Sequence, residues 1–187
     1  MNDNIYPSLE EVIQRVVRAI LSLYRNDREL LQVDANERSI THKLAEHLQK
    51  EFQEWHVDCE YNRRGFNKKK LIEIMKPELP TENTILDDTE ARTVFPDIII
   101  HKRTTPLNLL VIEVKKDNDY DSTMDIQKLV AFGQDRNYRY RFGLFLRLGS
   151  SGCTEIKLFG EGREMQNEAI LIMELVQENL GELGYGG

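Results

Sequence analysis

The stretch from Val94 to Lys116 constrains the fold most, and it reads VFPDIIIHKR, TTPLN and LLVIEVKK. Two aliphatic, largely β-branched runs flank a short cluster of Thr, Pro and Asn, which is typical of two strands joined by a turn. If the strands pair antiparallel, the start of the first lies beside the end of the second. We therefore expect Asp97, at that start, to lie next to Glu113 and Lys115, at that end.

The charged residues of this stretch stand on strands that are otherwise apolar. Side chains alternate along a strand, so Glu113 and Lys115 share one face while Val114 points the other way. Ionised side chains are rarely buried unless they are paired or bind a metal. Two neighbouring carboxylates repel each other, and a shared proton or a cation relieves that repulsion.

This set of residue types favours one kind of chemistry. Carboxylate oxygens in a partly open site suit Mg²⁺ or Mn²⁺ better than zinc. A lysine on the same face can hold an attacking water or stabilise charge on a phosphate. The pattern therefore indicates metal-assisted hydrolysis of a phosphodiester. The simpler alternative is that Glu113 and Lys115 form a surface ion pair and that Asp97 caps a turn after Pro96.

Pro96-Asp97, followed by Glu113-Val114-Lys115 at the end of the next apolar strand, resembles the signature of the PD-(D/E)XK nuclease superfamily. That superfamily includes restriction endonucleases and Holliday junction resolvases, and the resemblance covers roughly residues 34–159. It implies a restriction endonuclease-like core, with Asp97 and Glu113 as metal ligands and Lys115 as the catalytic lysine. It also implies a Mg²⁺- or Mn²⁺-dependent nuclease acting on DNA. The alternative is a catalytically inactive protein of the same fold that binds nucleic acid or protein.

Two helices are expected before the first strand. Residues 8–25 carry an apolar stripe at helical spacing, and Ser8 with Glu11 forms a capping box at their start. The second helix is expected from Asp34 to about residue 52, with Asp34 as its N-cap. Glu37 lies in its first turn, near the inner face. The resemblance makes Glu37 a further metal ligand; the alternative is a capping-box residue that suits the positive end of the helix.

A basic segment follows the strand expected at residues 56–61. Between residues 62 and 76 the chain has six Lys or Arg and a single acid, with aromatic residues beside them. Next to a phosphodiester site, such a segment is a candidate for holding a nucleic-acid backbone, and a solvated hairpin loop is the alternative. The residues assigned to DNA binding here are Arg63, Arg64, Lys68, Lys69 and Lys70. We expect a short strand at residues 71–75 and a surface loop at 77–93.

The acidic run after Lys116 leads into a third helix. Ser122 and Asp125 have the spacing of a capping box, and the helix is expected to run to about residue 132. On this helix Gln127 and Lys128 match positions from which a Gln or Lys of the resembling family often reaches toward the site. Both are therefore candidate nucleic-acid contacts, or else ordinary boundary residues of an amphipathic helix.

The remaining elements complete an α/β pattern. A strand is expected at residues 140–148, broken by Gly143, and a GSSG hairpin joins it to a strand at 154–159. Together with an added N-terminal helix (8–25) and C-terminal helix (163–180), these elements predict one α/β domain over residues 1–187. Its centre is expected to be a mixed β-sheet flanked by helices.

Composition limits the partners and the compartment. Net charge is −7, which counts against general nucleic-acid binding, so a DNA partner needs a local basic face. The two cysteines stand far apart in the sequence, which favours a reducing cytoplasm. We expect no membrane span and no secretory signal peptide. No DNA-reading motif is recognisable, so a homodimer or a protein partner is expected to supply specificity.

Overall fold

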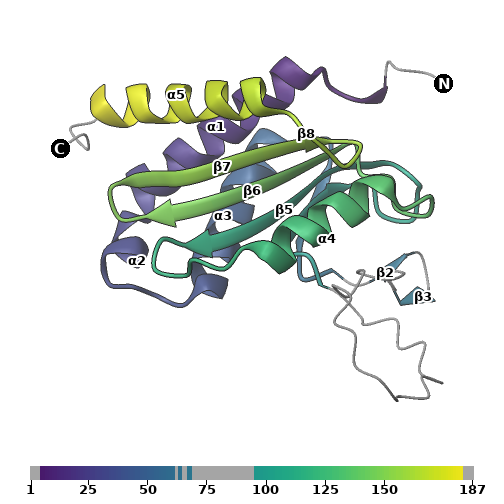
Figure 1. The fold of residues 1–187 in the computed structure, drawn as a ribbon, viewed down its shortest axis with the longest axis horizontal. Coiled ribbons are helices and arrows are strands. Elements are labelled where there is room, and N and C mark those ends of the chain that lie inside the picture. The colour runs from purple at the N-terminus through teal and green to yellow at the C-terminus, as the bar shows by residue number, and fades with distance from the viewer. Residues whose placement is uncertain (1–4, 62, 65–66, 69–94, 183–187) are drawn as a thin grey trace, which may run out of the picture.

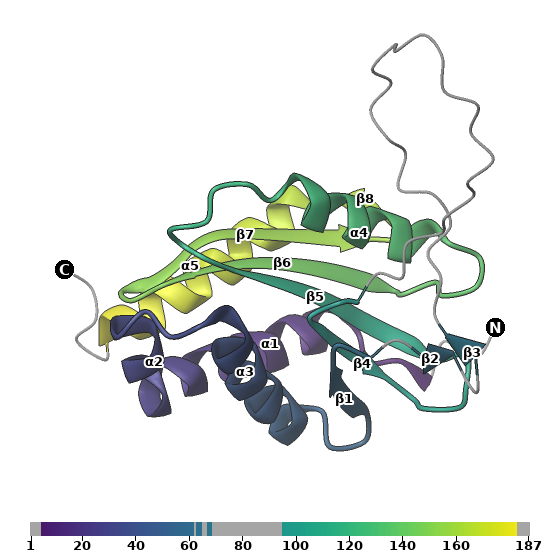
Figure 2. The ribbon, with the colours of Figure 1, turned by 90° about the horizontal axis from the view of Figure 1, so that it is seen from below.

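The structure, a computed structural model, describes residues 5–61, 63–64, 67–68 and 95–182 of the 187-residue chain. A six-stranded mixed sheet has the order β1-β4-β5-β6-β7-β8 (Figure 1 and Figure 2). In this sheet β5 and β6 are parallel, and the other described pairs are antiparallel. The strands are β1 (His56–Cys59), β4 (Ile98–His101), β5 (Asn108–Lys116), β6 (Phe142–Gly149), β7 (Gly152–Gly160) and β8 (Arg163–Glu164).

Helices cover both faces of the sheet (Figure 2). On one face pack α1 (Leu9–Asn26), α3 (Glu37–Glu51) and α5 (Gln166–Glu182), and the short α2 (Arg28–Gln32) joins α1 to α3. The other face carries α4 (Thr123–Gln134). A separate two-stranded ribbon consists of β2 (Arg63–Arg64) and β3 (Asn67–Lys68). The expected α/β class, with a mixed central sheet flanked by helices, is confirmed.

Strand β5 divides the apolar core into two clusters. Ile112 and Val114 pack with α1, α3 and α5, whereas Val111 faces α4 and packs with Leu129 and Phe132. Burial on both sides explains why β5 is apolar almost throughout instead of alternating with polar residues. Each such side chain contributes about 1.5–3 kcal/mol through burial. The face of the sheet that carries α4 is therefore largely apolar, and a charged side chain on it is unusual.

The strands β4 and β5 form the antiparallel hairpin expected from the sequence. Ile98 lies opposite Ile112, and Ile99 lies opposite Val111. Asp97 immediately precedes Ile98, so this register puts it across from Glu113. The pairing thus brings the start of one strand to the end of the other, as the sequence predicted.

The parallel pairing of β5 with β6 requires a crossover, which α4 supplies. Helix α4 begins shortly after β5 ends, so its first turn lies close to the last residues of that strand. The strand expected at residues 140–148 is not broken at Gly143 as predicted, because β6 runs continuously from Phe142 to Gly149. A Cβ on Gly143 would lie 3.3 Å from the Leu129 Cβ, so the glycine lets α4 approach the strand.

Helix starts follow local capping. The Ser8 cap is confirmed, since its Oγ accepts a hydrogen bond from the Glu11 amide at 3.2 Å. The expected start of the second helix at Asp34 is wrong: Asn36 is the N-cap and α3 begins at Glu37. Asp34 has a left-handed backbone with φ of 53°, so it lies in the turn before α3 and not at its N-cap. Its carboxylate instead forms an ion pair with Lys116 at 2.6 Å.

The expected C-terminal helix at 163–180 begins too early, because residues 163–164 form β8 and α5 runs from Gln166 to Glu182. Cys59 and Cys153 are free thiols. In the described ranges, no helix combines the length and the apolar character needed to cross a membrane. The strand expected at 71–75 and the loop expected at 77–93 lie outside the described residues.

Candidate active site

The three predicted site residues, Asp97, Glu113 and Lys115, lie on the face of the sheet that carries α4. Asp97 Oδ2 accepts a hydrogen bond from the Val114 amide at 2.8 Å, which joins the start of β4 to the end of β5. Glu113 is fully buried on the same face. Lys115 follows one pleat later, and its Nζ lies 3.1 Å from Asp119 Oδ2. The hairpin thus places all three predicted residues at one end of the strand pair.

The two carboxylates destabilise each other's charge. Burial raises the pKa of Asp97. The Val114 amide and the ammonium groups of Lys128 and Lys115 lower this pKa, but they offset only part of the effect of burial. Burial raises the pKa of Glu113 well above its ordinary value, and the negative charge of Asp97 raises it further. Such a pair favours binding of a proton or a cation. The simple alternative of an exposed ion pair between Glu113 and Lys115 does not fit, because Glu113 is buried and binds a different lysine.

That lysine is Lys128, which reaches the site from α4. Its Nζ lies 2.9 Å from Glu113 Oε2 and 2.8 Å from Asp125 Oδ1. Burial lowers the pKa of Lys128, but the two carboxylates outweigh burial and raise it. Lys128 therefore stays protonated and serves as an internal counter-ion of the site. Gln127, the other residue predicted on this helix, is half-buried beside it.

Two polar atoms of the site have no hydrogen-bond partner. Among the described residues, Glu113 Oε1 and Arg147 Nη1 are the buried side-chain atoms in this condition. Arg147 lies across from Lys115 on β6, and its Nε donates to Glu155 at 3.0 Å. Buried polar groups are nearly always satisfied, so an unpaired acceptor and an unpaired donor on adjacent strands require an explanation.

Glu37 also faces the site. Its Oε1 lies 3.9 Å from Lys115 Nζ, at the edge of ion-pair distance. Burial raises the pKa of Glu37, and the negative charge of Asp97 adds to this effect. The bond that caps α3 is donated by the Ser39 amide to Asn36 Oδ1 instead, so Glu37 is not needed to cap the helix.

The described residues do not form a complete set of metal ligands. Within residues 5–61 and 95–182, no three side chains of His, Cys, Asp or Glu gather closely enough to hold an ion together. Glu37 is thus not brought into one group with Asp97 and Glu113. Mg²⁺, however, usually keeps several waters and needs only one or two protein carboxylates. Asp97 and Glu113, with one bare acceptor oxygen, fit that requirement.

Sequence reasoning missed Asp119, Asp125 and Arg147. Asp125 was expected to cap its helix, yet the Ser122 side chain makes no cap bond and Asp125 binds lysines instead. The spacing of Asp125 and Lys128 on one helix face was a signal that could have revealed the pair. Arg147 stands in an apolar strand, and only the pairing of β5 with β6 brings it beside Lys115.

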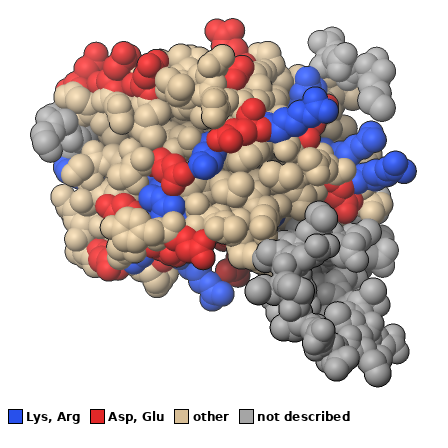
Figure 3. All heavy atoms as spheres, viewed as in Figure 1, with Lys and Arg blue, Asp and Glu red and all other residues tan. Residues whose placement is uncertain are grey.

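The predicted DNA-binding segment is only partly described. Arg63, Arg64 and Lys68 belong to the β2–β3 ribbon, whereas Lys69 and Lys70 lie outside the described residues. On the face that carries α4, basic and acidic side chains are interspersed, without a continuous basic surface among the described residues (Figure 3). A nucleic-acid partner would therefore meet alternating charges on this face.

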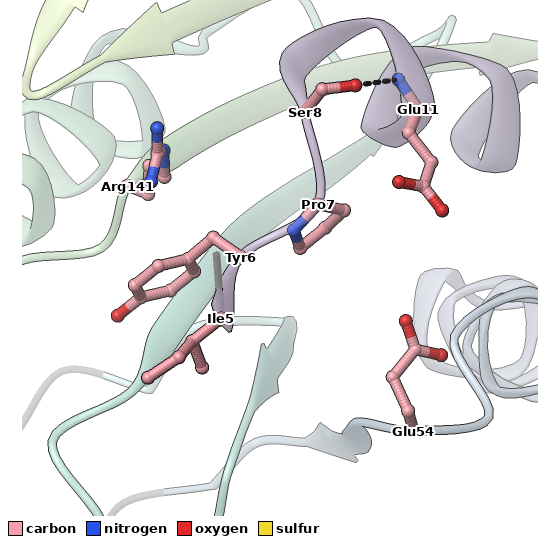
Figure 4. A pocket seen from close by; sticks show the side chains of 7 residues that line it. All are labelled: Ile5, Tyr6, Pro7, Ser8, Glu11, Glu54 and Arg141. Carbon is pink, nitrogen blue, oxygen red and sulfur yellow. Dashed lines mark hydrogen bonds between the residues drawn. The ribbon is translucent and has the colours of Figure 1, made fainter. Parts of the chain in front are cut away.

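An open pocket lies at the other end of β5 (Figure 4). The residues that line it surround the start of α1: Ile5, Tyr6, Pro7, Ser8, Glu11, Glu54 and Arg141. Tyr6 lies near Asn108, which is seven residues, or about 23 Å of strand, from Lys115. Arg141 stacks over Tyr6 at 5.2 Å, and both acids bind Arg15. The pocket is thus separate from the carboxylate site.

Comparisons of the chain with protein-family models, with curated proteins and with solved structures find no match. The likeness to the PD-(D/E)XK superfamily therefore stays a resemblance carried by Asp97, Glu113 and Lys115.

Proposed function

We propose that this chain is a Mg²⁺- or Mn²⁺-dependent phosphodiester hydrolase that acts on DNA. The observation that carries the proposal is the buried Glu113 carboxylate, which has one oxygen without a partner and lies opposite Asp97. A cation between the two acids would relieve their repulsion and satisfy that oxygen. The bare Nη1 of Arg147 on the next strand is complementary to an anion, such as a phosphate oxygen.

Each residue has a role that its surroundings support. Asp97 and Glu113 would hold the ion, which supplies a Lewis acid and an activated water. Burial lowers the pKa of Lys115, but Asp119, Asp125 and Glu37 outweigh burial and raise it. Lys115 is therefore protonated at neutral pH, so it can donate a hydrogen bond to the water or to a phosphate oxygen but cannot act as a base. The β2–β3 ribbon and residues 69–70 are the candidate contacts to the nucleic-acid backbone.

A cleavage assay on plasmid DNA in Mg²⁺ or Mn²⁺ tests this function. Lys115→Met removes the proposed catalytic ammonium, and Lys116→Met is its matched control. Lys116 is the next residue of β5, has the same 20% side-chain exposure and binds Asp34 at the surface instead of the site. We expect wild type and Lys116→Met to cleave and Lys115→Met not to cleave. Equal cleavage by the two variants would count against the proposed site.

Binding of the metal is measured separately by thermal unfolding. A ligand that binds only the folded state stabilises it by mass action. We expect millimolar Mn²⁺ to raise the Tm of the wild type but not that of Glu113→Gln. Absence of any shift in the wild type would contradict a metal site.

A non-catalytic binding module is the second candidate. It is favoured by the Lys128 ammonium, which already neutralises one Glu113 oxygen, and by the lack of three clustered ligands among the described side chains. In that case DNA binds without metal and is not cleaved. A gel-shift assay in EDTA, run beside the cleavage assay, separates the two candidates. A homodimer or protein partner, proposed as the source of specificity, is checked by the mass in solution.

A further inference from the structure

The first turn of α4 carries a buried acid that the proposed function does not yet use. Asp125 is only 6% exposed. Its position would suit a helix cap, but the bond that caps the start of α4 runs from the Thr123 amide to Asp121. The Asp125 carboxylate is thus available for other partners, and the positive end of the helix stabilises its charge.

The two oxygens of Asp125 face different lysines. Oδ1 lies 2.8 Å from Lys128 Nζ, and Oδ2 lies 3.5 Å from Lys115 Nζ. Lys128 Nζ also lies 2.9 Å from Glu113 Oε2. One carboxylate thereby links the proposed catalytic lysine to the lysine that neutralises a proposed ligand.

The two lysines depend on Asp125 to different degrees. Lys115 has further acidic partners, with Asp119 at 3.1 Å and Glu37 at 3.9 Å. Lys128 is held by Glu113 and Asp125. A divalent ion on the bare Glu113 Oε1 would repel the Lys128 ammonium on Oε2 and weaken that ion pair. Without Asp125, displacement would leave the ammonium in a mostly buried place with no carboxylate beside it, which is costly.

We propose that Asp125 is a positioning residue that retains Lys128 when a divalent ion takes Glu113, and that it aligns Lys115 at the same time. The inference rests on the proposed function. Its consequence is that a single acid, which need not touch metal or substrate, controls metal affinity and the placement of both ammonium groups.

Asp125→Asn, with Asp119→Asn as the matched control, tests the inference by calorimetric titration with Mn²⁺ in the absence of DNA. Both variants remove one negative charge close to Lys115. Asp119, however, is half-exposed, and of the two lysines it contacts Lys115 and not Lys128. Loss of a residue that orients a metal site typically lowers metal affinity roughly 10–100-fold. We expect that loss for Asp125→Asn, a smaller loss for Asp119→Asn, and recovery in Asp125→Glu.

A double-mutant cycle with Lys128→Gln separates positioning from a general structural effect. If Asp125 acts through Lys128, Asp125→Asn should change Mn²⁺ affinity much less when Lys128 is already replaced. Equal effects in both backgrounds would overturn the inference. Metal-free thermal unfolding and circular dichroism of each variant establish that it is folded.

Cleavage kinetics supply an independent readout. Misplaced ammonium groups should lower kcat more than they raise KM, because Asp125 is not one of the proposed contacts to DNA. If the wild type binds Mn²⁺ and cleaves DNA while Asp125→Asn behaves like Asp119→Asn, the inference alone fails. If the wild type neither binds Mn²⁺ nor cleaves, the proposed function fails and the inference fails with it.

Discussion

Asp58 of β1 and Glu113 of β5 are both acids on the central sheet, but their charges are balanced in opposite ways. Asp58 Oδ2 lies 2.8 Å from His101 Nε2 and 2.9 Å from Arg103 Nε, and Oδ1 binds Arg103 as well. Burial raises the pKa of Asp58, but these partners outweigh burial and lower it well below its ordinary value.

Glu113 has less compensation and a deeper position. Its single described cationic partner, Lys128, is shared with Asp125, and burial together with Asp97 keeps its pKa raised. The Asp58 cluster is complete, as expected of an ion pair that stabilises the fold. The Glu113 cluster leaves one buried carboxylate oxygen without a hydrogen-bond partner, which is what the proposed function requires of a metal ligand. The difference teaches that burial of a charge is less informative than whether its partners are all present.

Activity should distinguish the two clusters most strongly. Under the proposed function, Glu113→Gln should lower cleavage by at least about 100-fold, since removing one preorganised electrostatic group costs on the order of 10²–10³ in kcat. Asp58→Asn should leave the cleavage rate per folded molecule close to that of wild type. Single-turnover rates on plasmid DNA give both values. The reverse order would place the chemistry at the β1–β4 edge.

Stability should show the opposite order. Asp58→Asn weakens charge-assisted hydrogen bonds to His101 and Arg103, so we expect it to lower the free energy of unfolding by about 1.5–3 kcal/mol. Glu113→Gln removes a charge that burial and Asp97 disfavour, and Lys128 keeps Asp125 as its partner, so we expect a change within about 1 kcal/mol. Urea unfolding in EDTA measures both. A larger loss for Glu113→Gln would make Glu113 a structural residue.

The pH dependence should also have opposite signs at the two clusters. The raised pKa values of Asp97 and Glu113 mean that the folded protein holds extra protons, so their contribution to stability is full below the ordinary carboxyl range and is lost as pH rises through the raised values. The lowered pKa of Asp58 gives stability that is present above the ordinary Asp value and is lost as pH falls through the lowered one.

Metal binding offers a way to measure the pH dependence at Asp97 and Glu113. Mn²⁺ competes with the protons on Asp97 and Glu113, so we expect the Tm difference between Mn²⁺ and EDTA to grow from about pH 5 to about pH 8. Glu113→Gln should flatten that growth. A difference that shrinks with rising pH would contradict carboxylate ligands.

The smallest effect is expected at the exposed end of the complete cluster. Arg103→Ala removes one partner of Asp58, but His101 remains at 2.8 Å. The guanidinium is half exposed, so the cost should stay below about 1 kcal/mol. Urea unfolding against wild type checks this value. A loss as large as that of Asp58→Asn would show that Arg103, rather than His101, completes the cluster.

Local patterns predicted the frame of the site. The two aliphatic runs around residues 102–107 fixed the hairpin, and alternation correctly put Glu113 and Val114 on opposite faces of β5. The Ser8 cap was predicted because capping depends on neighbours in sequence. The start of α3 was not, because Asp34 and Asn36 are both competent caps and only the left-handed backbone at Asp34 decides between them.

The partners of the site could not be predicted in the same way. From the resemblance, Lys128 was expected to reach toward the site as a candidate nucleic-acid contact. Its ion pair with Glu113 was not predicted, because it depends on how α4 packs across β5 and β6. In the sequence, Arg147 is a single polar residue within an apolar strand. Only the parallel register of β5 and β6 shows that it lies beside Lys115. These contacts are long-range, so a single sequence without its fold does not specify them. Asp97 and Glu113 were found because one short turn brings them together.

The hydrogen bond from the Val114 amide to Asp97 gives the molecule a built-in spectroscopic reporter. The acceptor is one oxygen of a proposed ligand, and the donor belongs to the backbone of the adjacent strand. Any ion drawing electron density from that carboxylate must weaken the bond, so the amide proton of a single valine should shift upfield in an NMR titration. Occupancy could then be followed at one resonance without any substitution near the site.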